Sequence, residues 1–254
     1  MPDINIYEQK QRSNKKVIIV GNSPSILLHE FGEIIDSYDI VIRVNRCVTK
    51  GFEKHVGKKI DIWSTTTMLS YEDFYPENYK KIKYLWTRTK KANPDTKWLK
   101  LPKDFPSWPR KNRYIMYKQQ KHYMNYDNFL KPFKLEKEPC TGLLTILTAC
   151  RFFENITVHG FTFGTQNTSD NRVTGYYRES ELDKNGEHPE DIFWFADRNL
   201  RWANKKETLK RRNVLKKLVE EGIPKKSKED KYGFEIAHPK LKILNKAELE
   251  DMSI

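Results

Sequence analysis

Short apolar runs rich in β-branched residues recur along the chain, and segments with helical patterns lie between them. Such runs, bounded by polar or glycine-bearing turns, predict buried strands. We expect strands at residues 17–20, 38–45, 58–65, 81–87, 155–164 and 241–244. We expect helices at residues 25–35, 140–153 and 191–222, and a short helix in the C-terminal tail. The alternation predicts an α/β fold with one mostly parallel sheet covered by helices on both faces.

Three segments fall outside this pattern. Residues 1–15 are expected to be an N-terminal extension ahead of a single domain at 16–254. Residues 90–139 are aromatic, basic and proline-bearing, which indicates a variable, partly helical insert. Residues 166–187 are polar and turn-rich, which indicates a mobile loop. Ser23 and Ser25 mark the expected start of the first helix, and Gly222 with Pro224 marks the end of the long one.

Small and polar residues gather where the expected strands end, at residues 21–25, 43–46, 64–67 and 160–164. In open parallel sheets, ligands bind beyond these carboxyl ends. The first turn lacks the glycines of dinucleotide and P-loop fingerprints, which argues against a dinucleotide. Asn22 and Asn45 each follow a strand, and their amides suit a phosphate or ribose hydroxyls. Taken singly, each asparagine is equally typical of a turn.

The expected helix at 140–153 begins with Cys140, Thr141 and Gly142. The amides and positive dipole end of a helix N-terminus suit a carboxylate or phosphate, and Thr141 adds a hydroxyl. The alternative is a plain N-cap.

The composition limits the location and the classes of binding partner that we expect for this chain. The 254 residues are 37% hydrophobic and 32% charged, typical of a globular protein, and no run reaches the roughly 18 apolar residues of a membrane span. The first 16 residues lack the apolar core of a signal peptide, so a cytoplasmic location is expected. The net charge of +13 favours an anionic partner or a solvated lysine-rich surface, and no nucleic-acid recognition motif is present. Cys47, Cys140 and Cys150 form neither a disulfide framework nor a zinc-ligand pattern.

Two stretches resemble the sialyl motifs of the animal-type sialyltransferases, glycosyltransferase family 29. The segments VGNSPS and IDSYDIVIRVNRCVTKGFEKHVGKKID resemble the long motif in order and spacing. The segment PCTGLLTILTACRFFENITVHGFTFG resembles the short motif. The first turn is also similar to that of the bacterial lipooligosaccharide sialyltransferases.

The resemblance implies a GT-A-like variant of a Rossmann-like fold, a CMP-activated sugar donor, and inverting transfer without a metal ion or other cofactor. It implies that Asn22, Ser23 and Asn45 bind the phosphate and ribose of the donor. It further implies donor contacts at Thr66, Thr141, Gly142, Gly160 and Phe161.

The family's third and fourth motifs resemble GYYRE and HPEDIF. Gly175 stands where the family has histidine, which leaves Tyr176 and Tyr177 as phosphate-binding phenols. His188 matches the fourth motif, and we expect it to be the general base, because a histidine pKa near 6.5 suits that task. Phe193 replaces the motif glutamate, so either Glu190 or Asp191 is left to orient the imidazole. The structural alternative for His188 is a surface or capping histidine.

Val17 and Phe153 stand where the animal enzymes carry a disulfide. An apolar pair suits a reducing compartment, which favours a bacterial or viral cytoplasmic version. The insert and the mobile loop are expected to contact the glycan acceptor, and the basic insert to meet an anionic inner membrane face. Three alternatives stay open: a transferase using another CMP-activated acidic sugar such as CMP-Kdo, a sialyltransferase-like protein that only binds, and a nucleic-acid-binding protein.

Overall fold

The computed structural model describes residues 12–45, 48–65, 82–87, 113–116, 127–135, 139–161, 205–223 and 237–246. Within these residues one seven-stranded sheet runs through the molecule in the order β5-β4-β3-β2-β1-β6-β7. Every neighbouring pair is parallel. The strands are Ser13–Val20 (β1), Ile40–Val44 (β2), Ile62–Thr65 (β3), Tyr84–Thr87 (β4), Arg113–Ile115 (β5), Phe153–His159 (β6) and Lys242–Ile243 (β7). The predicted α/β fold with a parallel sheet is confirmed.

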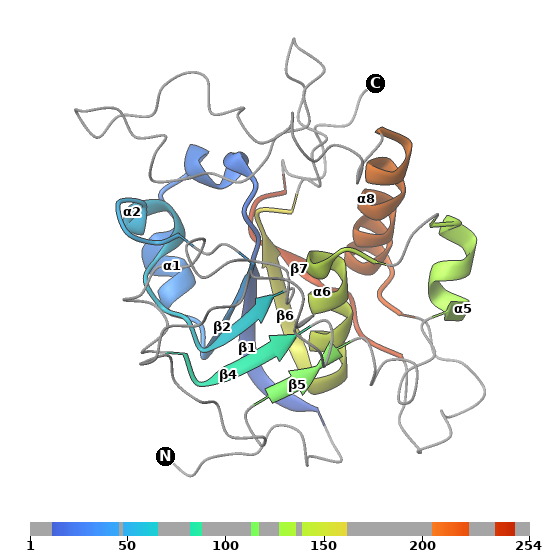
Figure 1. Cartoon of the computed structure of the whole chain (residues 1–254), viewed down its shortest axis with the longest axis horizontal. Helices are drawn as coiled ribbons and strands as arrows, with labels where there is room; N and C mark the ends of the chain where they lie inside the picture. The colour runs from blue at the N-terminus through green and yellow to red at the C-terminus, as the bar shows by residue number, and fades with distance from the viewer. Residues whose placement is uncertain are drawn as a thin grey trace, which may run out of the picture.

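Helices cover both faces of the sheet, as Figure 1 shows. One face carries the 3₁₀ turn η1 (Pro24–Leu28) and the short helices α1 (Gly32–Asp36) and α2 (Glu53–Val56). The other carries α6 (Thr141–Phe152) and α8 (Lys205–Glu220), with α5 (Asp127–Leu130) and η4 (Lys131–Phe133) beyond α8. None of the described helices is both long and apolar enough to cross a bilayer.

The central strand β1 shows why the sheet needs both layers. Its last four residues are all buried and are β-branched, which suits a strand covered on two sides. Val17 and Ile19 join the core under α6 and α8, whereas Ile18 and Val20 join the core under α1 and α2. Because β1 lies between β2 and β6, the residue after it is an interior position of the carboxyl edge of the sheet.

The predicted helix at 25–35 is wrong in its extent, because it is broken into η1 and α1. Gly32 explains the break. A Cβ on this residue would lie 2.0 Å from the carbonyl oxygen of Glu53 in α2, so the chain approaches its neighbour at a glycine. A glycine in the middle of a helix costs about 1 kcal/mol relative to alanine, and a new helix therefore begins there.

Strand β3 begins four residues later than predicted. The backbone N–H groups of Lys58 and Lys59 donate to the carboxylate of Asp36 at 2.8–2.9 Å. These amides are consequently not part of the sheet ladder, and pairing starts at Ile62.

The region from residue 90 to 139 is more than an insert. Its residues Arg113–Ile115 form β5, which pairs in parallel with β4 and forms one edge of the sheet. The region therefore contributes a strand to the sheet, and its interpretation as a variable, partly helical insert stays a prediction. Hydrophobic periodicity could not reveal a three-residue strand in an aromatic, basic segment, since pairing with β4 stabilises it.

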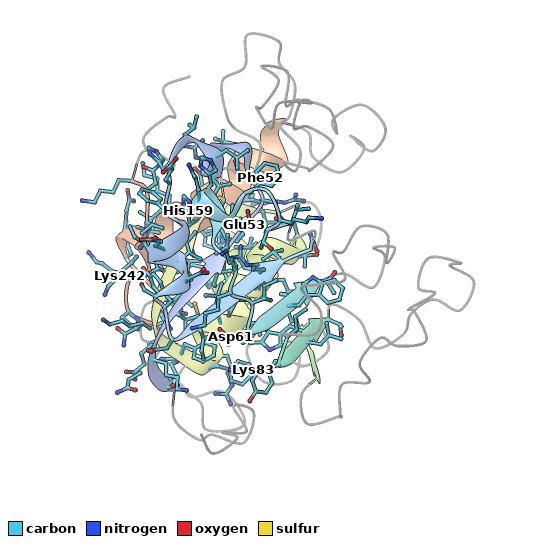
Figure 2. All side chains as sticks on the ribbon, turned by 90° about the vertical axis from the view of Figure 1, so that its left-hand side faces the viewer. Phe52, Glu53, Asp61, Lys83, His159 and Lys242 are labelled. Carbon is cyan, nitrogen blue, oxygen red and sulfur yellow. The ribbon has the colours of Figure 1, made fainter. Side chains whose placement is uncertain are left out.

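Carboxylates tie the strands together away from the carboxyl edge. Asp39 accepts the N–H of Lys16 at 2.8 Å. The nearly buried Asp61 accepts the N–H of Val41 at 2.9 Å and pairs with the ammonium of Lys83 at 3.3 Å. Figure 2 shows Asp61 and Lys83 toward one end of the sheet, and His159 and Phe52 toward the other.

The buried His238 gives stability a pH dependence. Its ring nitrogens lie 2.6 Å from the carbonyl oxygen of Pro239 and 2.7 Å from that of Phe153. Burial lowers the pKa of His238 below its ordinary value of 6.5, and the two carbonyl contacts offset this only in part. Arg12 lowers the pKa further, and Glu154 raises it slightly.

We therefore expect the folded state to lose stability as the pH falls below 6.5, because the unfolded chain then takes up a proton that the folded chain resists. The stability that His238 contributes is fully present above that pH. Thermal unfolding across this range should show a shallower fall for His238→Gln than for the wild type. Parallel profiles would contradict this assignment.

Candidate functional site at the carboxyl edge

The chain reverses its direction of winding at β1. From β1 it builds β2 to β5 on one side, and it then returns to place β6 on the other side. In parallel sheets such a switch point opens a crevice at the carboxyl ends of the two central strands, where ligands bind. Here the residues at that point are the turn after β1, beginning at Gly21, and the turn after β6, beginning at Gly160.

The two turns touch through their backbones. The N–H of Gly21 donates to His159 O at 2.8 Å, and the N–H of Ser23 donates to Gly160 O at 3.2 Å. A Cβ on Gly21 would lie 2.1 Å from Gly160 O. The single glycine of the first turn therefore allows two turns to pack, and Gly160 itself has a φ of +74°, which favours glycine.

Asn22 links the first turn to the second strand. Its side-chain Nδ2 donates to Val44 O at 2.6 Å, and the residue is buried. Among the described residues, no donor reaches its Oδ1. The Asn22 amide thus holds the end of β2 with one of its two N–H groups and keeps the second N–H and Oδ1 for a ligand.

Asn45 ends β2 in a left-handed backbone conformation, with φ at +52°. Asparagine tolerates this conformation better than other non-glycine residues. Its N–H donates to Ser64 O at 2.8 Å, and its carbonyl accepts the indole N–H of Trp63 at 2.8 Å. The left-handed backbone and these two hydrogen bonds therefore fix the position of Asn45 at the end of β2.

Helix α6 meets the same edge with its N-terminus. The first intrahelical bond runs from Leu144 N–H to Cys140 O, so the N–H groups of Thr141, Gly142 and Leu143 precede it. One turn into the helix, the Thr145 hydroxyl lies 2.6 Å from the Ser64 hydroxyl of β3 and 2.7 Å from Thr141 O. The ends of β1, β2, β3 and α6 are therefore joined by one continuous series of hydrogen bonds.

The described part of this edge is polar and uncharged. The turns and strand ends carry asparagine, serine, threonine and glycine, and no carboxylate stands at residues 21–25, 45, 64–65, 140–142 or 160–161. An anionic ligand meets no repulsion from these residues, and their amides and hydroxyls are suitable donors for it.

The sequence model of glycosyltransferase family 29 (sialyltransferase) matches residues 2–192. The chain belongs to this family.

Curated proteins of similar sequence are also named sialyltransferases. The chain is 27% identical over 166 residues to a chicken CMP-N-acetylneuraminate-beta-galactosamide-alpha-2,3-sialyltransferase 1, covering 61% of this chain and 46% of the relative. It is 30% identical over 187 residues to a chicken alpha-N-acetylgalactosaminide alpha-2,6-sialyltransferase 1, covering 60% and 33%. The matches thus span about a third to a half of these relatives' lengths.

Solved sialyltransferase structures also match this chain. A mammalian sialyltransferase in complex with Gal-beta-1-3GalNAc-ortho-nitrophenol matches 94% of this chain and 72% of its own, with a TM-score of 0.47 at 18% identity. The sialyltransferase CstII from Campylobacter jejuni, in complex with cytidine-5'-monophosphate, matches 83% and 78%, with a TM-score of 0.41 at 16% identity.

In this family 29 chain, much of the stretch that resembles the long sialyl motif supports the frame of the site. The buried Arg43 donates from Nε to Lys59 O at 2.9 Å and from Nη2 to Val56 O. Asp36 binds the loop after Gly57, where an added Cβ would meet its carboxylate at 2.3 Å. These motif residues hold the end of β2 in place.

The structure brings together most of the predicted donor-binding residues of the family 29 site. They lie at one edge of the sheet and are Asn22, Ser23, Asn45, Thr141, Gly142, Gly160 and Phe161. Gly160 and Phe161 also pack against Gly21. The donor contacts of all seven stay predictions. Thr66, Tyr176, Tyr177, His188, the loop at 166–187 and the orienting candidates Glu190 and Asp191 lie outside the described residues.

Sequence reasoning missed Ser64 and Thr145, which join β3 to α6. The available signal was threonine at 141, 145 and 148, a spacing that puts three hydroxyls on one buried helix face. A hydroxyl there needs a partner, and Ser64 at the end of β3 supplies it.

Val17 and Phe153, the apolar pair expected at the positions of the family disulfide, are both fully buried in the core under α6. Of the two cysteines within the described residues, Cys140 is half-buried and Cys150 is buried. Burial raises the pKa of the Cys150 thiol to about 12, which makes it unreactive. The cytoplasmic location and the bacterial or viral origin stay predictions.

Proposed function

We propose that this chain transfers sialic acid from CMP-sialic acid to a sugar hydroxyl of a glycan, with inversion and without a metal ion. The observation that carries the proposal is the hydrogen-bonded frame at the switch point. It holds Asn22, Asn45 and the N-terminus of α6 at one uncharged edge of the sheet.

Chemistry supports a nucleoside monophosphate as the group bound there. A single phosphate needs a few donors and no bare-backbone loop, and amide side chains with helix N–H groups supply them. Two relatives are named for CMP-N-acetylneuraminate, with a beta-galactosamide in the chicken protein and a beta-1,4-galactoside in a rat protein. A third relative is named for alpha-N-acetylgalactosaminide. We extend that donor class, and a glycan acceptor, to this chain.

In the proposed reaction the acceptor oxygen forms a bond to the anomeric carbon of the sugar, while the bond from that carbon to the phosphate oxygen breaks. His188 accepts the proton of the acceptor hydroxyl. The electron pair of the broken bond stays on the CMP phosphate. Tyr176, Tyr177 and the edge amides donate hydrogen bonds to that growing charge.

The donor is tested by measuring CMP release from CMP-sialic acid and from CMP-Kdo, each with a panel of galactoside, galactosaminide and glycolipid acceptors. We expect acceptor-dependent release from CMP-sialic acid. Release of CMP from CMP-Kdo but not from CMP-sialic acid would identify Kdo as the transferred sugar. CMP binding without release from either donor would indicate a binding protein, which the replacements Gly175 and Phe193 make the second candidate.

Asn22→Ala should weaken CMP binding about tenfold to a hundredfold, because a hydrogen bond to a charged group contributes about 1.5–3 kcal/mol. Titration calorimetry with CMP measures this. Asn155→Ala is the matched control, since Asn155 Nδ2 also donates to a strand carbonyl, Asn14 O at 2.9 Å, at the other end of β1. Equal CMP affinity in both variants would remove the nucleotide assignment from the first turn.

A further inference from the structure

We propose that Ser64 and Thr145 are positioning residues of the donor site, which set the first turn of α6 against Asn45. The inference rests on the proposed function, because it concerns the same site. Neither residue is assigned a contact with the donor. Their effect passes through the backbone of Asn45 and through the peptide that joins Thr141 to Gly142.

Both hydroxyls are completely buried. A buried hydroxyl without a hydrogen bond costs about 1–3 kcal/mol, so burial favours the contact between these two. The two oxygens are 2.6 Å apart, and Thr145 Oγ1 lies 2.7 Å from Thr141 O. The pair is thus a specific contact between β3 and α6.

The directions of the two bonds follow from the number of protons. Each hydroxyl has one hydrogen to donate. The carbonyl of Thr141 can only accept, so Thr145 donates to it. Ser64 then donates to Thr145 Oγ1, and the sulfur of Met116, 3.3 Å from Ser64 Oγ, is a second, weaker acceptor for the same O–H group. The order is Ser64 O–H to Thr145 O–H to Thr141 C=O.

This series ends on a peptide whose other side faces the edge. The carbonyl of Thr141 and the N–H of Gly142 belong to one peptide unit, and that N–H is among the three that precede the first bond of the helix. Hydrogen bonds in series polarise one another. Donation to the carbonyl therefore makes the Gly142 N–H a stronger donor and fixes its direction.

Ser64 also binds the backbone of the turn after β2. Its carbonyl accepts the N–H of Asn45 at 2.8 Å, while its hydroxyl binds Thr145. One residue therefore connects the turn after β2 with the start of α6. Loss of the hydroxyl pair lets this turn and α6 move relative to each other, although both elements stay folded.

Thr145→Val tests the inference because it removes the hydroxyl and keeps the β-branched shape. We expect CMP to bind about threefold to tenfold more weakly, in line with one lost hydrogen bond. The KM for the donor should rise by the same factor, with kcat and the acceptor KM nearly unchanged. Thr145→Ser should restore wild-type affinity.

Thr148→Val is the matched control, since Thr148 is buried one turn further along the same helix. It should cost stability without changing CMP affinity. Ser64→Ala should weaken binding as Thr145→Val does, and the double variant should be no weaker than the singles, because all three break the same series. If Thr145→Val does not fold, the CMP affinity of Ser64→Ala tests the positioning role.

The two levels of the proposal fail differently. No measurable CMP binding by the wild type would overturn the proposed function. Wild-type CMP affinity in a folded Thr145→Val or Ser64→Ala would overturn the positioning role and leave the function intact. Equal losses in Thr145→Val and Thr148→Val would reduce the effect to general destabilisation of α6.

Discussion

Gly21→Ala should yield little folded protein. The new Cβ would lie 2.1 Å from Gly160 O and 2.8 Å from Gly160 C. Both are backbone atoms, so no side-chain rotation relieves the overlap. Relief requires β1 and β6 to separate at their ends, which breaks the bonds from the N–H groups of Gly21 and Ser23. Core overpacking typically costs about 1–3 kcal/mol, and this clash belongs above that range.

The total stability of a domain is about 5–15 kcal/mol, so such a loss is a large share of it. We expect the melting temperature of any soluble Gly21→Ala protein to fall by roughly 10 °C or more. Its affinity for CMP should fall as well, because Asn22 follows directly. Differential scanning calorimetry and calorimetric CMP titration measure the two effects.

Gly160→Ala is the matched control, since it places the same methyl on the other side of the same contact. Its Cβ would lie 3.2 Å from the flexible end of Ile26, with the nearest backbone atoms at 3.3 Å. The left-handed backbone at φ +74° adds about 1–2 kcal/mol of strain. A melting temperature lowered by only roughly 2–6 °C is expected. Equal losses in both variants would contradict the packing explanation for Gly21.

The same contact shows what sequence reasoning can reach. The apolar runs and the residues that follow them were enough to predict a parallel sheet with polar strand ends. They also placed Asn22 and Asn45 at the ends of successive strands, where ligands bind in parallel sheets. The pattern did not reveal that Gly21 faces Gly160, since that contact joins turns about 140 residues apart.

Element boundaries depend on contacts of the same long-range kind. Gly32 interrupts the predicted first helix because α2 packs against it, and Asp36 takes the amides that would have lengthened β3. Strand β5 exists because β4 offers it an edge. Local propensity contains none of these partners, so the predicted strands were right in place and wrong in length.

The residues of the candidate site were likewise only partly predictable from the sequence. Side chains that stand at strand ends were predictable from spacing alone. The Ser64–Thr145 pair was not, because serine and threonine within apolar segments give no sign of whether they bind each other, the backbone or a ligand. Burial decides between these partners, and burial is a property of the assembled layers.

His188→Ala should reduce the rate of transfer about a hundredfold to ten-thousandfold while leaving CMP affinity unchanged, as expected for loss of a general base. The acceptor hydroxyl must lose its proton as the new bond forms, and an imidazole is half-protonated near pH 6.5. The wild-type kcat/KM should therefore rise with pH as the base loses its proton, and this rise should be absent in the variant. Initial rates of CMP release across the pH range measure both effects.

His29→Ala is the control for removing a histidine. The ring of His29 stacks on Phe31 at 5.0 Å, and the carbonyl that binds His55 survives the substitution, so transfer should continue at close to the wild-type rate.

Glu190→Gln and Asp191→Asn then test which of the two carboxylates orients the imidazole of His188. The carboxylate that orients the imidazole is the one whose loss lowers kcat and shifts the pH profile, because an imidazolium loses stabilisation without it. Full activity in His188→Ala would remove the base from this position and shift the assignment to another group at the edge.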